Sequence, residues 1–339
     1  MDLSSEYWNG VTPAEREALA RCLAKQLPSG FTFQAVRHFR LGEWQQHVAL
    51  YQKENATFAL IPSTETLLGY DADRPLEANS DEHESWQRTS DEYGINKSIG
   101  EYVAEVTLRV RRVELSPFLI ETAAGELGWE PIGIDEPEVQ SILREYPTQE
   151  QVEVSHGGAS TRVRREQREI IAERSLSCTH ADLAAQLAKS GFRFPTSDEW
   201  EYVCGGGTPT LFRWGDHVPC DRYPTDISPA EAAWRRQWIL SAGNLERPAE
   251  GFASDWDYHH QPNGFGLLIA SDPYKYELVA EIGVSRGGDG GCTICGGAGF
   301  FIGWLTLATA YFEEHSCKHD PTEPISHGYT VGRRVLELR

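Results

Sequence analysis

The sequence lacks most of the features that mark secreted, membrane-bound and nucleic-acid-binding proteins. Its seven cysteines are odd in number and scattered apart from one close pair, which argues against a disulfide framework and indicates a reducing compartment. Residues 1–10 lack the basic stretch and apolar run of a signal peptide, and no segment has the apolar length that a bilayer requires. We therefore expect a cytoplasmic protein with no membrane partner.

Basic residues are also scarce. The chain of 339 residues carries 31 Lys and Arg against 51 Asp and Glu, and its formal charge of −20 disfavours nucleic acid as a partner because it repels a phosphate backbone. The apolar share of 40% is typical of globular proteins, and a chain of this length buries a large core without disulfides. The single Met contrasts with ten Trp, whose rings we expect in the core or lining a cleft.

Residues 1–55 are predicted to form an N-terminal helical section. Thr12 is placed to cap a helix over residues 11–27, and Glu15 stands where a capping box needs it. A second helix is expected between residues 33 and 51. Together the two helices would precede the main domain.

Residues 56–339 are predicted to form that main domain. Short strands are expected at 57–62, 65–69, 102–110 and 331–338. Capped helices are expected at 180–190 and 196–204. The polar segment 72–98 is expected to be a surface loop, and the charged segment 145–170 is expected to be mobile.

The histidines do not form an obvious metal-binding pattern. His259 and His260 are adjacent and would lie on opposite sides of an extended chain, so we interpret them as exposed loop histidines. On the helix expected between residues 33 and 51, His38 and His47 would lie roughly 180° apart, because a helix has 3.6 residues per turn. They would not face a common ion.

Six segments carry the most specific information. In chain order they are ALIPSTETLLGYD (59–71), FRFPTSDEWEY (192–202), RWGD (213–216), QPNGFGL (261–267), SRGG (285–288) and GRRV (332–335). In order and spacing they resemble the formylglycine-generating enzyme family, also called sulfatase-modifying factors, over residues 57–339. The resemblance implies an α+β, C-type-lectin-like fold with a small twisted antiparallel sheet, two helices and much irregular but ordered chain. Most of the motif residues, Trp200 and Trp214 included, are interpreted as structural.

The resemblance also implies an activity. The family's oxidases hold copper(I) with two cysteines that follow the R-G-G-S segment, and they use dioxygen to convert a substrate cysteine to formylglycine. Here Cys292 lies six residues after Arg286 and matches the first of these cysteines, whereas the second would fall at Gly297 and is replaced by Cys295. The implied function is a copper–thiolate oxidase of a thiol-containing small molecule or peptide, with Cys292 and Cys295 as ligands. Asp289, where the family has serine, would orient substrate or water.

Calcium is the second ion that the resemblance implies. The family's G-N-V-W-E-W segment aligns with residues 273–278, where the Asn-containing turn is lost and Glu277 remains. Asn244 matches another calcium-site position. We therefore expect Glu277 and Asn244 as calcium ligands.

The cysteine pair leaves other interpretations open. Two thiolates three residues apart suit a soft ion such as Cu(I) or Zn(II), and Cys317 with His319 would complete a zinc site. The pair would otherwise be a redox dithiol or two buried, unreactive cysteines. At the level of function, the alternatives to the oxidase are a non-catalytic binding or scaffold protein on the same fold and an enzyme that uses neither cysteine.

Overall fold

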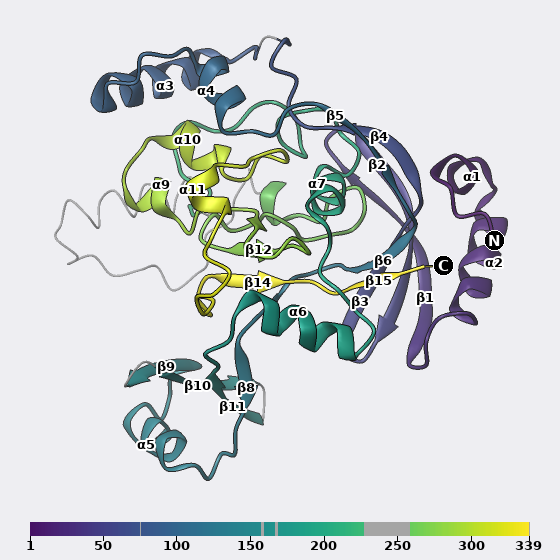
Figure 1. The fold of residues 1–339 in the computed structure, drawn as a ribbon, viewed down its shortest axis with the longest axis vertical. Helices are drawn as coiled ribbons and strands as arrows, with labels where there is room; N and C mark the ends of the chain where they lie inside the picture. The colour runs from purple at the N-terminus through teal and green to yellow at the C-terminus, as the bar shows by residue number, and fades with distance from the viewer. Residues whose placement is uncertain (75, 157–158, 167–168, 227–257, 339) are drawn as a thin grey trace.

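A five-stranded sheet joins the two ends of the chain. The computed structural model describes residues 1–339 except 75, 157–158, 167–168, 227–257 and 339 (Figure 1). The protein is of mixed α+β class, and the largest sheet has the order β1-β2-β3-β6-β15 with every neighbouring pair antiparallel. Its strands are β1 (Phe31–Leu41), β2 (Trp44–Lys53), β3 (Ala56–Ile61), β6 (Phe118–Glu121) and β15 (Val335–Glu337).

Both faces of this sheet are covered, because alternate residues of its strands point to opposite sides. Helices α1 (Ser5–Gly10) and α2 (Pro13–Ala24) cover one face, as Figure 1 shows. The core on that side includes Trp8, Leu23, Tyr51, Phe58 and Leu60. Helix α7 (Ser197–Gly205) covers the other face, where the core includes Ala59, Ile61, Phe118, Trp200 and Val203.

The N-terminal prediction is confirmed for the first helix and wrong for the second. Helix α2 has the predicted capping box, in which the Glu15 amide donates to the Thr12 hydroxyl and the Thr12 amide donates to the Glu15 carboxylate. Residues 33–51, however, belong to the hairpin β1–β2, whose two-residue turn has Gly42 at φ +57°. Since β2 pairs with β3, the sheet continues across the boundary predicted between residues 55 and 56.

Two further predictions on the N-terminal half need correction. The segment 72–98 is not a loop throughout, because it contains α3 (Ser80–Tyr93), capped by Asn79 and Glu82. The strand predicted at 102–110 is also wrong, since its first residues belong to α4 (Ile99–Glu105). The two strands predicted at 57–62 and 65–69 are confirmed as β3 and β4 (Thr64–Leu68), and β4 pairs with β5 (Arg111–Leu115).

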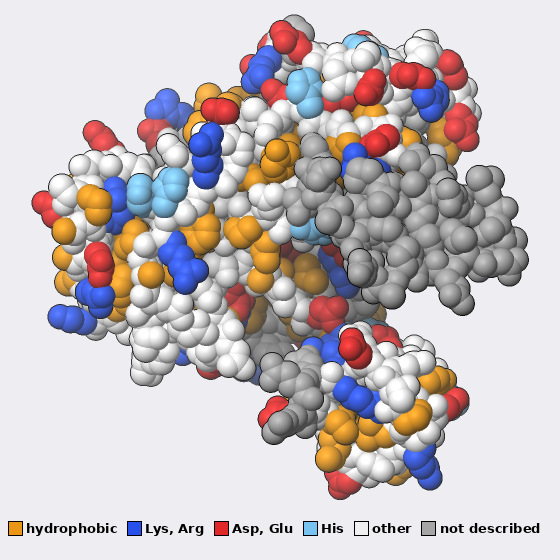
Figure 2. Space-filling model, turned by 180° about the vertical axis from the view of Figure 1, so that it is seen from behind, with side chains coloured by type: hydrophobic (Ala, Val, Ile, Leu, Met, Phe, Trp, Pro, Cys, Tyr) orange, Lys and Arg blue, Asp and Glu red, His pale blue; other side chains and the backbone are white. Residues whose placement is uncertain are grey.

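A small lobe stands apart from the body of the molecule (Figures 1 and 2). Its sheet has the order β8-β11-β10-β9 and packs against α5 (Pro137–Glu145) around Val139, Ile142, Val152, Val163 and Ala172. The segment 145–170, predicted to be mobile, contributes two whole strands and the start of a third. The four strands are β8 (Trp129–Pro131), β9 (Gln151–His156), β10 (Ala159–Glu166) and β11 (Glu169–Ser175).

The cysteine pair lies in the C-terminal part of the chain, beside a third sheet of order β13-β12-β14-β7. Its strands are β7 (Gly125–Glu126), β12 (Tyr276–Leu278), β13 (Ser285–Arg286) and β14 (Thr330–Gly332). The terminal strand predicted at 331–338 is divided between β14 and β15. The helices of this region are α9 (Cys292–Cys295), α10 (Phe300–Leu305), α11 (Glu314–Cys317) and the short 3-10 helix η1 (Tyr258–His260).

The two capped helices predicted before this region are confirmed as α6 (His180–Lys189) and α7. Helix α7 ends at Gly205 and is capped by Gly206 in the left-handed conformation, as its glycine run indicates. Among the helices that the structure describes, none combines the length and the apolar character that crossing a membrane demands.

Candidate functional site

The segment that carries the cysteines starts from a buried ion pair. Arg286 on β13 has an exposed fraction of 0%, and its Nη2 lies 3.1 Å from Oε2 of Glu201 on α7. The guanidinium also donates to the Ser197 hydroxyl (3.0 Å) and the Thr309 carbonyl (2.9 Å). A buried charge is tolerated when it is paired and hydrogen-bonded, so Arg286 fixes the place where the following turn leaves the core.

Asp289 then shapes that turn. The side chain is 2% exposed, and its carboxylate accepts hydrogen bonds from the Gly291 amide (2.8 Å), the Thr293 amide (2.9 Å) and the Thr293 hydroxyl. Gly288 has φ +137°, and a Cβ there would lie 2.6 Å from the Lys275 carbonyl oxygen, so the turn accepts only glycine. Both carboxylate oxygens of Asp289 therefore accept hydrogen bonds from backbone amides of the turn. The sequence had suggested instead that Asp289 orients substrate or water.

Cys292 and Cys295 lie on the single turn α9, and both are exposed. Residues three apart on a helix lie on the same side, so the structure brings the two predicted ligands to one face of α9. The Cys295 amide donates to the Gly291 carbonyl (2.8 Å), which closes the turn. The alternative of two buried cysteines is wrong. At Gly297, where the family's second cysteine would fall, φ is +72°, a conformation that favours glycine.

Two tyrosines from the segment before β13 border the cysteines, and neither was singled out by the sequence. The Tyr274 hydroxyl lies 3.3 Å from the Cys295 sulfur. The Tyr276 hydroxyl lies against Gly290, where a Cβ would be 2.5 Å from it. Burial, followed by the negative charges of Cys292 and Asp289, raises the pKa of Tyr276 to about 12. The sequence signal that could have pointed to these two tyrosines was their place in the segment aligned with G-N-V-W-E-W.

The structure does not complete the predicted zinc site. Cys317 is fully buried, and burial raises the pKa of its thiol to about 11. In the part of the chain that the structure describes, no group of three or more His, Cys, Asp and Glu side chains is placed to hold a metal ion. Among the described His, Cys, Asp and Glu side chains, the donors that α9 presents are the sulfurs of Cys292 and Cys295.

The calcium expectation fails at Glu277. This carboxylate is 4% exposed, and its two oxygens accept hydrogen bonds from Nε and Nη2 of the buried Arg333, the latter at 3.0 Å. Because a guanidinium faces both oxygens, Glu277 does not fit a cation site. Asn244, the other expected calcium ligand, lies outside the described residues.

The structure corrects both histidine expectations, except that His260 is exposed as expected. His259 is not an exposed loop residue: its exposed fraction is 0%, and its Nε2 lies 2.8 Å from the Pro224 carbonyl oxygen. His38 and His47 do not lie on opposite sides of a helix. They are cross-strand partners in β1 and β2, with ring centroids 4.9 Å apart.

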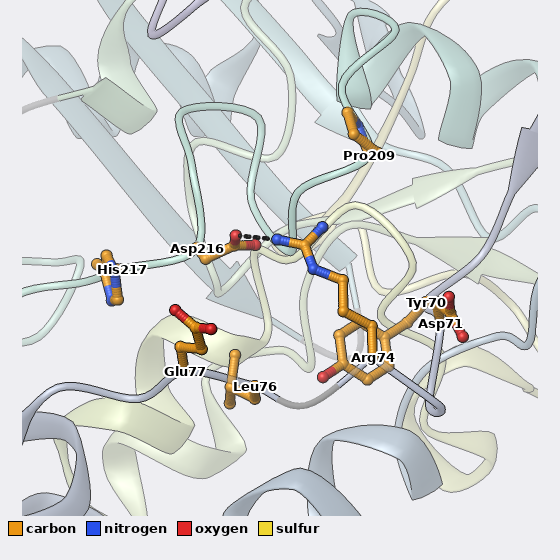
Figure 3. A pocket seen from close by; sticks show the side chains of 8 residues that line it. All are labelled: Tyr70, Asp71, Arg74, Leu76, Glu77, Pro209, Asp216 and His217. Carbon is orange, nitrogen blue, oxygen red and sulfur yellow. Dashed lines mark hydrogen bonds and ion pairs between the residues drawn. The ribbon is translucent and has the colours of Figure 1, made fainter.

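Figure 3 shows a hollow of about 210 Å³ that contains none of the predicted site residues. It lies between the segments 70–77 and 209–217, and its most prominent cation, Arg74, is 2.9 Å from the Asp216 carboxylate. Because this cation is already paired, the hollow offers no strong charge for an anionic ligand.

No protein-family model matches this chain, and no curated protein matches its sequence. The likeness to formylglycine-generating enzymes therefore stands on the six motifs and on the position of Cys292.

Proposed function

We propose that this chain is a divergent relative of the formylglycine-generating enzymes, with a C-type-lectin-like fold, in which the α9 thiols form the centre of an oxygen-dependent thiol oxidase. One observation carries the proposal: Cys292 and Cys295 are exposed on one face of a helical turn whose base is fixed in the core. Thiolates are the reactive form of cysteine, and exposure gives a substrate access to them.

The chain's own residues have separate roles in this centre. Cys292 and Cys295 supply two soft sulfur donors, Asp289 holds the turn that presents them, and the Tyr274 hydroxyl orients the Cys295 sulfur through its hydrogen bond. Arg286 keeps the turn at a fixed distance from the core through its pair with Glu201. The rigid base limits the relative motion of the two sulfurs, which favours capture of a single ion.

The two thiolates match copper(I) in chemical character, because thiolates are soft ligands that select soft ions. When bound, the ion would supply electron transfer to dioxygen. The residues fit calcium less well, because Glu277 is held by Arg333, and we derive no role for calcium.

A second candidate is a non-catalytic binding or scaffold protein on the same fold. The observation that favours it is the sulfur count: Gly297 stands where the family has its second cysteine, and α9 provides only two donors. A lone pair of exposed thiols does not by itself require catalysis.

Copper titration of the reduced protein tests the proposal. We expect one Cu(I) per chain in competition with a colorimetric Cu(I) chelator, and loss of that copper in both Cys292→Ser and Cys295→Ser. The matched control is Cys22→Ser, because Cys22 is an exposed cysteine outside this region. Oxygen consumption with a simple thiol should depend on the same two residues.

The outcomes separate the two candidates. Stoichiometric copper and cysteine-dependent oxygen uptake support the oxidase. Full copper retention in the Cys292→Ser/Cys295→Ser double variant would refute the proposed centre. Copper binding at α9 without oxygen uptake from any thiol would favour the binding protein.

A further inference from the structure

A cavity of about 240 Å³ lies next to the cysteine turn and belongs to none of the roles assigned above. Its floor is one face of the third sheet. Tyr276 and Leu278 of β12 stand two residues apart, Tyr276 pairs with Thr330 of β14, and Leu278 pairs with Ser285 of β13. The register therefore places these four side chains on the same face. Residues 315–326, which include part of α11, form the walls.

Three polar side chains line the cavity, and one of them has a buried atom without a hydrogen-bond partner among the described residues. Ser285 is 2% exposed and Thr330 is 5% exposed, and each contributes a hydroxyl-bearing side chain to the lining. The unpaired buried atom is Nε2 of His319. Buried polar atoms in folded proteins are nearly always satisfied, so this nitrogen, beside two residues that carry hydroxyls, indicates that the cavity receives a polar ligand.

The charge of the rim favours a cation. Asp320 and Glu323 contribute two carboxylates, whereas the ammonium of Lys318 lies 2.6 Å from the Glu314 carboxylate. Two hydroxyl oxygens and an imidazole nitrogen can each accept a hydrogen bond, and a primary ammonium group has three N–H donors to give. Burial lowers the pKa of His319, so its ring is neutral at neutral pH and does not repel a cation.

Tyr276 connects this cavity to the thiols. Its ring lines the cavity, while its hydroxyl lies against Gly290 at the start of the cysteine turn. We propose that the cavity is a subsite for a primary ammonium group, and that the substrate is a small aminothiol whose sulfur reaches past Tyr276 to Cys292. The ammonium subsite stands by itself, whereas the identity of the substrate rests on the proposed thiol chemistry.

Calorimetric titration of the reduced protein with three probes tests the subsite. Cysteamine carries the amine and the thiol, propylamine carries the amine alone, and 2-mercaptoethanol carries the thiol alone. We expect cysteamine and propylamine to bind, and 2-mercaptoethanol to bind at least about tenfold more weakly, because a hydrogen bond to a charged group contributes that much or more.

The variants Thr330→Val and Ser285→Ala remove one acceptor each at nearly constant volume. Each should weaken the binding of cysteamine and of propylamine about tenfold. Thr66→Val on β4 is the matched control and should bind as the wild type does, because Thr66 lies outside this cavity. Circular dichroism and thermal unfolding confirm that the variants are folded.

Unchanged amine binding in both Thr330→Val and Ser285→Ala, or equal binding of propylamine and 2-mercaptoethanol, overturns the subsite. The variant Cys292→Ser separates the two proposals. If it binds propylamine normally while no thiol drives oxygen uptake in the wild type, the subsite stands and the oxidase falls. If cysteamine is oxidised but propylamine never binds, the oxidase stands and the subsite falls.

Discussion

Acid should destabilise this protein through a histidine that the fold buries in its neutral form. His259 is fully buried, and its Nε2–H donates to the Pro224 carbonyl. Its ring packs edge-on against Trp304, with centroids 4.8 Å apart. Burial, then the charge of His260, lowers the pKa of His259 to about 3, so the folded protein does not protonate it at pH 5.

The magnitude follows from proton linkage. A histidine in the unfolded chain has a pKa of about 6.5, so between pH 8 and pH 5 the unfolded state gains a proton that the folded state does not bind. The unfolded state binds more protons, hence the free energy of unfolding rises with pH and falls as the pH drops through the unfolded pKa. For one such group the loss between pH 8 and pH 5 is about 2 kcal/mol.

The variant His259→Gln isolates this contribution. Urea unfolding followed by tryptophan fluorescence at pH 8 and pH 5 should show that the variant loses about 2 kcal/mol less than the wild type over the same interval. His38→Gln, on the exposed part of β1, is the control for removal of an imidazole. The reasoning is refuted if His259→Gln keeps the wild-type pH dependence, or if the His259 ring titrates near pH 6.5 in the folded protein by NMR.

Three further predictions concern stability and thiol access. Glu277→Gln leaves the buried guanidinium of Arg333 without its counter-charge and should lower the free energy of unfolding by roughly 3–5 kcal/mol in a urea titration. Gly69→Ala should lower the free energy of unfolding by about 2–3 kcal/mol, because Gly69 has φ +100° and a Cβ there would lie 2.2 Å from a backbone oxygen. Gly100→Ala should instead raise it by about 0.5–1 kcal/mol, because Gly100 lies on α4 with open space where a Cβ would lie. In a thiol-labelling time course, the α9 cysteines should react rapidly, whereas the fully buried Cys204 should react only after denaturation.

Local rules were sufficient for three helices that carry their own start signal. The boxes begun by Thr12, Thr179 and Thr196 all form as their sequences indicate, because each depends only on residues three positions apart. The same signal was present at Asn79 and Glu82 and was missed, because the surrounding polar residues show no clear apolar period. Composition alone is therefore a poor reason to assign a loop.

The prediction of a helix in place of the hairpin β1–β2 was wrong for a different reason. A register shift between Phe33 and Ala35 breaks the alternation of β1, so its apolar residues no longer recur at every second position. The decisive local signal was Gly42, since a two-residue hairpin turn needs a positive φ there. Burial of His259 could not be read from its neighbours at all, because the groups that enclose it, such as Trp304, are distant in the chain.

The residues that carry the family resemblance are different from those that would carry the chemistry. Arg213, Arg286 and Arg333 come from three of the motifs, and each is at most 1% exposed. Their guanidinium groups bond to carbonyls or carboxylates inside the core, so selection for folding is enough to keep them. Cys292 and Cys295 are exposed, and the core does not require their sulfurs. Motif matches therefore argue for the fold, and an argument for catalysis has to come from the behaviour of the two thiols themselves.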